Sequence, residues 1–128
     1  MALKNLLRLQ LLYYLLGIAF NAVSYYLIST GGQALTPNEP IGGSIAMTIY
    51  ASFLLSGFLK KIWLYRILMG IAVLLLGYGG VFNHFNFIRE TPELYHSIAA
   101  GAIGMSINIF GLILNILAAT GKFKVTDP

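Results

Sequence analysis

Residues 78–97, YGGVFNHFNFIRETPELYHS, contain both histidines of the chain. His84 lies between Asn83 and Asn86, and Arg89 follows one turn later. Imidazole titrates near neutral pH and ligates metals or haem, and the planar guanidinium group of arginine binds carboxylates and phosphates. This stretch therefore holds the side chains best suited to bind a ligand, move a proton or support a redox centre.

Glu93 and His96 are three residues apart, a spacing that places two side chains on one face of a helix and that occurs in di-iron bundles. Such sites need further glutamates from other helices, and the apolar segments of this chain contain none. Thr91 as a cap, Pro92 in the first helical position and Glu93 at the positive helix end explain the same residues structurally. We therefore predict a helix start here, predict no metal site, and identify no cofactor.

Small and polar residues form stripes along two apolar segments. In the last segment they alternate at spacings of four and three, which is one face of a helix: Ser97, Gly101, Gly104, Asn108, Gly111, Asn115 and Ala118. The first segment has a similar stripe: Gln10, Tyr14, Gly17, Asn21 and Ser24. One interpretation is that both stripes are packing seams between helices. The other is that they line a polar cavity for a solute, a lipid headgroup or a quinone.

Composition defines the elements that position these residues. Of 128 residues, 58% are hydrophobic and 9% are charged, whereas a soluble domain has about 25% charged residues. Four apolar segments approach the roughly 20 residues that span a bilayer. The sequence therefore predicts an all-α integral membrane protein, a single four-transmembrane-helix bundle with helices at about 9–28, 44–59, 67–87 and 92–120. The chain has no cysteine, which excludes disulfides and iron–sulfur clusters.

The basic residues are distributed unequally between the connections. Seven of them fall on one predicted side and only Arg89 on the other: Lys4, Arg8, Lys60, Lys61, Arg66, Lys122 and Lys124. Because cytoplasmic loops carry an excess of lysine and arginine, both termini are predicted to be cytoplasmic. The membrane that we expect is the inner membrane of a bacterium. The net charge of +4 reports this orientation, so no nucleic-acid partner is predicted.

A weak repeat relates the two halves of the chain. Residues 17–21, GIAFN, resemble residues 79–83, GGVFN, and a Thr-Pro pair follows each of them, at Thr36 and at Thr91. The order is preserved, although the spacing requires gaps. This pattern indicates two similar helical hairpins whose connecting loops lie on the same side, which is a parallel repeat.

No acidic or basic residue lies deep within a predicted helix, which argues against an ion-coupled pump. The leading interpretation is a small non-enzymatic membrane protein, a homo-oligomer or subunit of a larger complex, with an outward-facing polar pocket for a lipid-like or small polar ligand. Two alternatives stay open. One is a passive channel or facilitator for a small solute, lined by membrane asparagines, and the other is a membrane enzyme or redox site that uses His84 and His96.

The sequence assigns residues to two roles. The predicted ligand-binding or pore-lining residues are Asn21, Asn83, His84, Asn86, Arg89, His96, Asn108 and Asn115. The predicted helix-packing residues are Gly17, Gly101, Gly104 and Gly111. The partners expected from these assignments are the lipid bilayer, further copies or other membrane subunits, and a lipid or small-molecule ligand.

Overall fold

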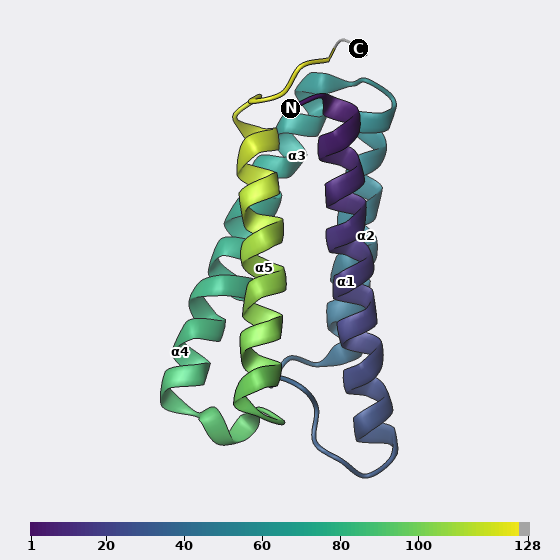
Figure 1. Cartoon of the computed structure of the whole chain (residues 1–128). Coiled ribbons are helices and arrows are strands. Elements are labelled where there is room, and N and C mark those ends of the chain that lie inside the picture. The colour runs from purple at the N-terminus through teal and green to yellow at the C-terminus, as the bar shows by residue number, and fades with distance from the viewer. Residues whose placement is uncertain (126–128) are drawn as a thin grey trace.

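The computed structural model describes residues 1–125, and Figure 1 shows a bundle of long helices. Its elements are α1 (Leu3–Ser29), α2 (Pro40–Phe58), α3 (Ile62–Leu75), the π-helix η1 (Leu76–Phe82), α4 (Asn83–Glu90), the 3₁₀ turn η2 (Pro92–Leu94) and α5 (Ile98–Ala119). α3, η1 and α4 follow one another without a break and form one span, Ile62–Glu90. Together with α1, α2 and α5, this span makes four helices that are long and apolar enough to cross a membrane. The predicted all-α four-helix membrane bundle is confirmed. Residues 126–128, which fall within the predicted domain, lie outside the described part.

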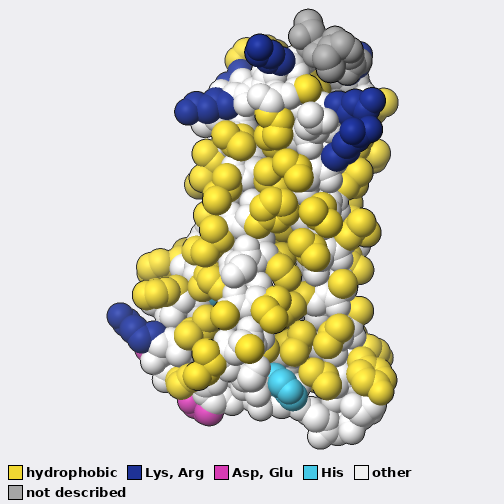
Figure 2. Space-filling model, viewed as in Figure 1, with side chains coloured by type: hydrophobic (Ala, Val, Ile, Leu, Met, Phe, Trp, Pro, Cys, Tyr) yellow, Lys and Arg dark blue, Asp and Glu magenta, His cyan; other side chains and the backbone are white. Residues whose placement is uncertain are grey.

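The helices form two hairpins that turn at the same end. Residues 30–39 connect α1 to α2, and residues 91–97 connect α4 to α5. We call this end the loop end (Figure 1, bottom). The N-terminus, the α2–α3 turn and the residues that follow α5 lie at the opposite end, where lysine and arginine side chains gather in Figure 2. We call this the basic end.

The half of the bundle nearer the basic end has a packed core. Its buried side chains come from all four spans and include Leu3, Leu6, Leu7, Leu54, Tyr65 and Ala118. The chain after α5 returns to the N-terminus, where Lys124 O accepts from Leu3 N at 2.8 Å. Arg66 Nε donates to Ala119 O at 3.1 Å, which joins α3 to the end of α5. The basic end is therefore closed by apolar packing and backbone pairing.

Two helices begin earlier than their apolar runs predict. In α1, which starts at Leu3, the charged side chains of Lys4 and Arg8 lie on the exposed side, and leucines one turn apart are buried. In the third span, which starts at Ile62, the Arg66 guanidinium lies 5.3 Å from the ring centroid of Trp63. Charged residues are compatible with these first turns because their heads remain near the membrane surface.

The second helix begins at Pro40, not at Ser44. Glu39 precedes it, and its carboxylate oxygens accept from Ile41 N at 2.9 Å and from Gly42 N at 2.6 Å. A carboxylate is favourable there because it satisfies free N–H groups and faces the positive end of the helix dipole. Proline at the first helical position lacks an N–H that would need a partner.

The predicted start of the last helix was wrong. The Thr91 side chain makes no cap hydrogen bond, and Pro92 and Glu93 belong to the short turn η2. Instead Ser97 is the cap, and its Oγ accepts from Ala100 N at 3.0 Å. Glu93 and His96 therefore do not share a helical face, which removes the geometric basis for a metal-binding pair.

The third span changes its winding where it passes the centre of the bundle. η1 is a π-helix that contains Gly77, Gly79 and Gly80. The carbonyl of Gly80 accepts from Asn108 Nδ2 of α5 at 2.8 Å, so this polar backbone group has a partner inside the bundle. Short π segments within α-helices are frequently found at functional sites.

Candidate functional site

A cavity of about 540 Å³ occupies the half of the bundle nearer the loop end. All four spans and the α1–α2 loop contribute to its wall. The apolar and aromatic part of the lining includes Tyr13, Phe20, Met47, Tyr50, Phe53 and Leu76, and the polar part includes Asn21, Thr36, Asn38, Glu39, His84, Asn108 and Asn115. A mainly apolar wall with a few polar groups is typical of small-molecule sites.

A buried polar network marks the end of this cavity nearer the basic end. Asn115 Oδ1 accepts from Gln10 Nε2 at 3.0 Å and from Tyr50 OH at 2.8 Å. Gln10 Oε1 accepts from Tyr65 OH at 2.5 Å, and Gln10 Nε2 also lies 3.1 Å from Met69 Sδ. One side chain from each span thus joins the network, which separates the cavity from the packed core. We call these four hydrogen-bonded residues, Gln10, Tyr50, Tyr65 and Asn115, the floor of the cavity.

Two donors at this end of the cavity, one in the floor and one beside it, have no protein partner. Asn115 is fully buried, and its Nδ2 makes no hydrogen bond among residues 1–125. Turning the amide over would place its Nδ2 against Gln10 Nε2, donor against donor, so the contacts favour the orientation in which Oδ1 accepts from Gln10 and Tyr50. The hydroxyl of Tyr13, which lines the same cavity, likewise has no partner in the described chain.

His84 closes the opposite end of the cavity. It is buried, its Nδ1 lies 2.6 Å from Tyr95 OH, and its Nε2 lies 3.3 Å from Asn38 Nδ2. Tyr95 OH also donates to His84 O at 3.3 Å. These contacts are satisfied together when Nδ1–H donates to Tyr95 and Nε2 accepts from Asn38, which is the neutral imidazole. We call His84, Asn38 and Tyr95 the roof.

Backbone and side-chain contacts join the two loops around the roof. Gln33 Nε2 donates to Glu93 O at 2.7 Å, and His96 N donates to Leu35 O at 3.2 Å. Burial raises the pKa of the Tyr95 phenol, so this hydroxyl stays protonated and able to donate at neutral pH. The roof therefore links the two hairpins at the loop end.

The structure brings four of the eight predicted site residues to the cavity: Asn21, His84, Asn108 and Asn115. Two of these have local structural partners. Asn21 Nδ2 donates to Gly17 O at 2.9 Å, and Asn108 Nδ2 donates to Gly80 O. Of the three asparagines among them, only Asn115 has a side-chain nitrogen that makes no hydrogen bond within residues 1–125.

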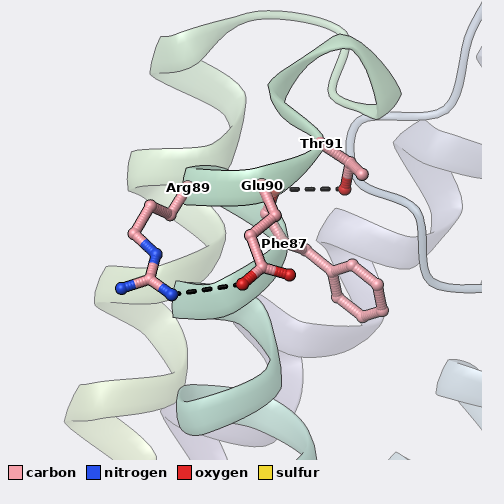
Figure 3. A network of polar contacts seen from close by, with 4 residues as sticks. All are labelled: Phe87, Arg89, Glu90 and Thr91. Atoms are coloured by element: carbon pink, nitrogen blue, oxygen red, sulfur yellow. Dashed lines mark hydrogen bonds and ion pairs between the residues drawn. The ribbon is translucent and has the colours of Figure 1, made fainter.

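The other four predicted residues, Asn83, Asn86, Arg89 and His96, are not part of the cavity lining. His96 is exposed beside the roof. In Figure 3 the side chains of Arg89 and Glu90 lie side by side, and Arg89 Nη2 lies 3.1 Å from Glu90 Oε1. Both side chains of this pair are about two-thirds exposed, so the pair contributes little to stability. In the same figure Thr91 Oγ1 donates to Phe87 O at 3.1 Å, which ends α4.

The four predicted packing glycines each receive a large side chain from elsewhere in the chain. A Cβ atom at Gly17 would lie 2.7 Å from Met47 Cε, and one at Gly104 would lie 3.1 Å from Phe20 Cζ. Gly101 accommodates Tyr95 in the same way, and Gly111 accommodates the ring of Tyr13. The glycine stripes therefore seat side chains that build the cavity wall and the roof.

Several residues of the site were missed by sequence reasoning. Tyr13 is buried and lines the cavity, whereas Tyr14, which the stripe selected, is only partly buried. Tyr50 and Tyr65 come from segments in which no polar stripe was recognised. The signal that could have indicated them is that each span carries a polar side chain at a similar height along the bundle. A search for stripes within single segments does not detect this pattern.

Comparisons of the chain with protein-family models, curated proteins and solved structures give no match. Function must therefore be inferred from the cavity itself. Within residues 1–125, no group of three or more histidine, cysteine, aspartate or glutamate side chains is placed to hold a metal ion. The described chemistry of the site is that of hydrogen-bond donors around an apolar space.

Proposed function

We propose that the protein is a non-enzymatic membrane protein that binds an amphipathic, lipid-like ligand in the cavity between its two hairpins. The observation that carries this proposal is the cavity of about 540 Å³, lined mainly by apolar side chains and bounded by a polar floor. A ligand of this kind buries its apolar body against the wall and satisfies its few polar atoms at fixed donors.

The surface around the cavity supports access from the bilayer. Ile49 of α2 and Leu75 of α3 both line the cavity, yet they are 52% and 68% exposed. Both belong to spans whose outer faces are apolar, so their exposed surface faces lipid. A molecule dissolved in the bilayer can therefore reach the cavity sideways, without crossing the roof.

The packed core favours a binding site over a pore. Apolar side chains fill the bundle between the floor and the basic end, and the floor itself is a hydrogen-bonded layer. His84 uses both ring nitrogens in the roof, and His96 is exposed, so no contact between the two histidines supports a shared reaction centre. Oligomer formation stays a prediction, because the four packing glycines contact side chains of their own chain.

Replacing Ala46 with tryptophan tests the binding function. Ala46 is exposed on α2 and lines the cavity, so an indole placed there would occupy the space without disturbing the floor. We expect the variant to retain about one tenth of the lipid that the wild type retains, or less, because blocking the site removes more than about 1.4 kcal/mol of binding free energy. The measurement is native mass spectrometry after exposure to a polar-lipid extract of the expression host.

Ala19→Trp is the matched control, because Ala19 is exposed on α1 and outside the cavity lining. It should retain lipid like the wild type, and both variants should unfold at the wild-type temperature. Equal lipid retention by Ala46→Trp, or no specific retention by the wild type, would reject the proposed function.

The proposed orientation places the basic end in the cytoplasm and the roof outside. It rests on the seven basic residues at one end, against Arg89 at the other. Because the chain has no cysteine, single cysteines report sidedness directly. In intact cells a membrane-impermeant maleimide should label Leu94→Cys and should label Leu59→Cys only after permeabilisation. The reverse pattern would invert the orientation.

A further inference from the structure

We propose, on the basis of the proposed function, that the ligand carries an uncharged carbonyl oxygen and that this oxygen binds at the floor of the cavity. Asn115 Nδ2 and Tyr13 OH are the two donors that receive it. The ligand class is thus an apolar molecule with a carbonyl group, such as a quinone or an uncharged ester lipid.

The free amide donor of Asn115 is the first observation. A polar group buried in a membrane protein without a hydrogen bond is costly, because neither water nor lipid replaces the missing partner. Among the described residues, Asn115 Nδ2 is the one fully buried side-chain nitrogen or oxygen atom without a hydrogen-bond partner, whereas the polar atoms of Gln10 and of both floor tyrosines are paired. A carbonyl oxygen in the cavity supplies the acceptor that the protein lacks.

Tyr13 places a second donor beside the first. Its ring lies against Gly111, which is one helical turn from Asn115 on the same face of α5. The ring also meets that of Tyr50 edge-to-face at a centroid separation of 5.2 Å, and Tyr50 is bonded to Asn115. The free hydroxyl of Tyr13 and the free amide of Asn115 thus belong to one corner of the cavity.

The charge of the lining determines the charge of the ligand. Glu39 is the only charged side chain in the lining, and both of its carboxylate oxygens cap α2. No lysine or arginine contributes to the wall. A phosphate or carboxylate at the floor would be a buried anion without a counter-charge, and an ammonium group would face two donors. An uncharged acceptor is the group that fits.

The experiment compares probes with similar apolar bodies and different polar groups. The probes are 2-decyl-1,4-benzoquinone, dioctanoylglycerol, decylbenzene, which lacks an oxygen, and dioctanoyl phosphatidic acid, which is anionic. Each is titrated into the purified full-length protein in detergent, and bound probe is counted by native mass spectrometry. At least one carbonyl probe should bind about tenfold or more tightly than decylbenzene and the phosphatidic acid, the effect of two hydrogen bonds.

The Tyr13→Phe variant tests the second donor without disturbing the fold, because the hydroxyl that it removes has no protein partner in the described chain. It should weaken the preferred carbonyl probe by about 3- to 10-fold and leave decylbenzene unchanged. Tyr14→Phe is the matched control and should leave every probe unchanged, since Tyr14 is not in the lining. The quinone and the glycerolipid distinguish the two sources of the carbonyl.

The outcomes separate this inference from the function on which it rests. If decylbenzene binds as tightly as the carbonyl probes, and Ala46→Trp abolishes its binding, the cavity is a lipid site but the carbonyl assignment is wrong. Tighter binding of the phosphatidic acid, or an unchanged affinity of Tyr13→Phe for the carbonyl probe, also overturns the inference. If no probe binds and no lipid is retained, both proposals fail.

Discussion

Replacing Asn115 with leucine is expected to lower the free energy of unfolding by about 1–3 kcal/mol, because it orphans two buried donors at once. Gln10 Nε2 and Tyr50 OH both lose their acceptor, Asn115 Oδ1, inside the bundle, where both residues are buried. Hydrogen bonds between membrane helices contribute about 0.6 kcal/mol on average and up to about 1.7 kcal/mol. Two such losses, with leucine filling a similar volume, give the expected range. Steric trapping in bicelles measures the unfolding free energy.

Asn83→Leu provides the matched control. Asn83 is partly buried, lies outside the cavity lining and makes no side-chain hydrogen bond in the described chain, so the same substitution should leave stability nearly unchanged. A fully apolar floor should recover much of the loss, since replacing all partners together leaves no orphaned donor. That variant combines Asn115→Leu with Gln10→Leu, Tyr50→Phe and Tyr65→Phe. If Asn115→Leu is as stable as Asn83→Leu, the floor does not hold the four spans together.

The sequence alone was sufficient to predict the four membrane spans. Their length and apolar composition are properties of local stretches, and each span needs only one unbroken helix to satisfy its backbone in lipid. The parallel arrangement of the hairpins follows from the same reasoning, because short loops force consecutive spans to be antiparallel neighbours. These features require no knowledge of how side chains meet.

Helix boundaries were less predictable, because several residues compete for the same role. Thr91 followed by Pro92 and Glu93 is a good helix start by residue type, yet Ser97 is the cap that the structure uses. In the first hairpin, Glu39 is the cap that the structure uses, so α2 starts at Pro40. The contacts between the two loops join residues about 60 positions apart in the sequence, and the choice among single-segment cap candidates does not take such contacts into account.

The rotation of α4 could not be predicted at all. Each residue of η1 advances by a π-helical rather than an α-helical angle, so the face on which every later side chain lies is shifted. After that shift His84 faces inward, whereas Asn83 and Asn86 lie outside the cavity lining. The glycines of η1 permit this winding, but glycines in a membrane helix equally suit close packing. Of the residues predicted in this stretch, His84 lines the cavity, whereas Asn83, Asn86, Arg89 and His96 do not, and their part in binding a ligand stays a prediction.

Replacing Gly111 with leucine should lower the free energy of unfolding by about 3 kcal/mol, because it overpacks the contact between α1 and α5. A Cβ atom there would lie 2.5 Å from Tyr13 Cζ and 2.7 Å from Tyr13 Cδ2, well inside contact distance. The Tyr13 ring is buried and held edge-to-face by Tyr50, so it cannot move without breaking other packing. Gly70→Leu is the control, since nothing lies within 4 Å of its Cβ position, and it should be no less stable than the wild type.

The way in which the Gly111→Leu variant relaxes connects stability to binding. If the Tyr13 ring swings into the cavity, its hydroxyl leaves the corner beside Asn115, and both lipid retention and carbonyl preference fall. Tyr13→Ala in the same chain should restore part of the stability, because it removes the atoms that collide, and the coupling between the two changes should exceed about 0.5 kcal/mol. Additive effects of Gly111→Leu and Tyr13→Ala would show that the glycine does not seat this ring. The cavity wall would then depend on contacts other than the small-residue face of α5.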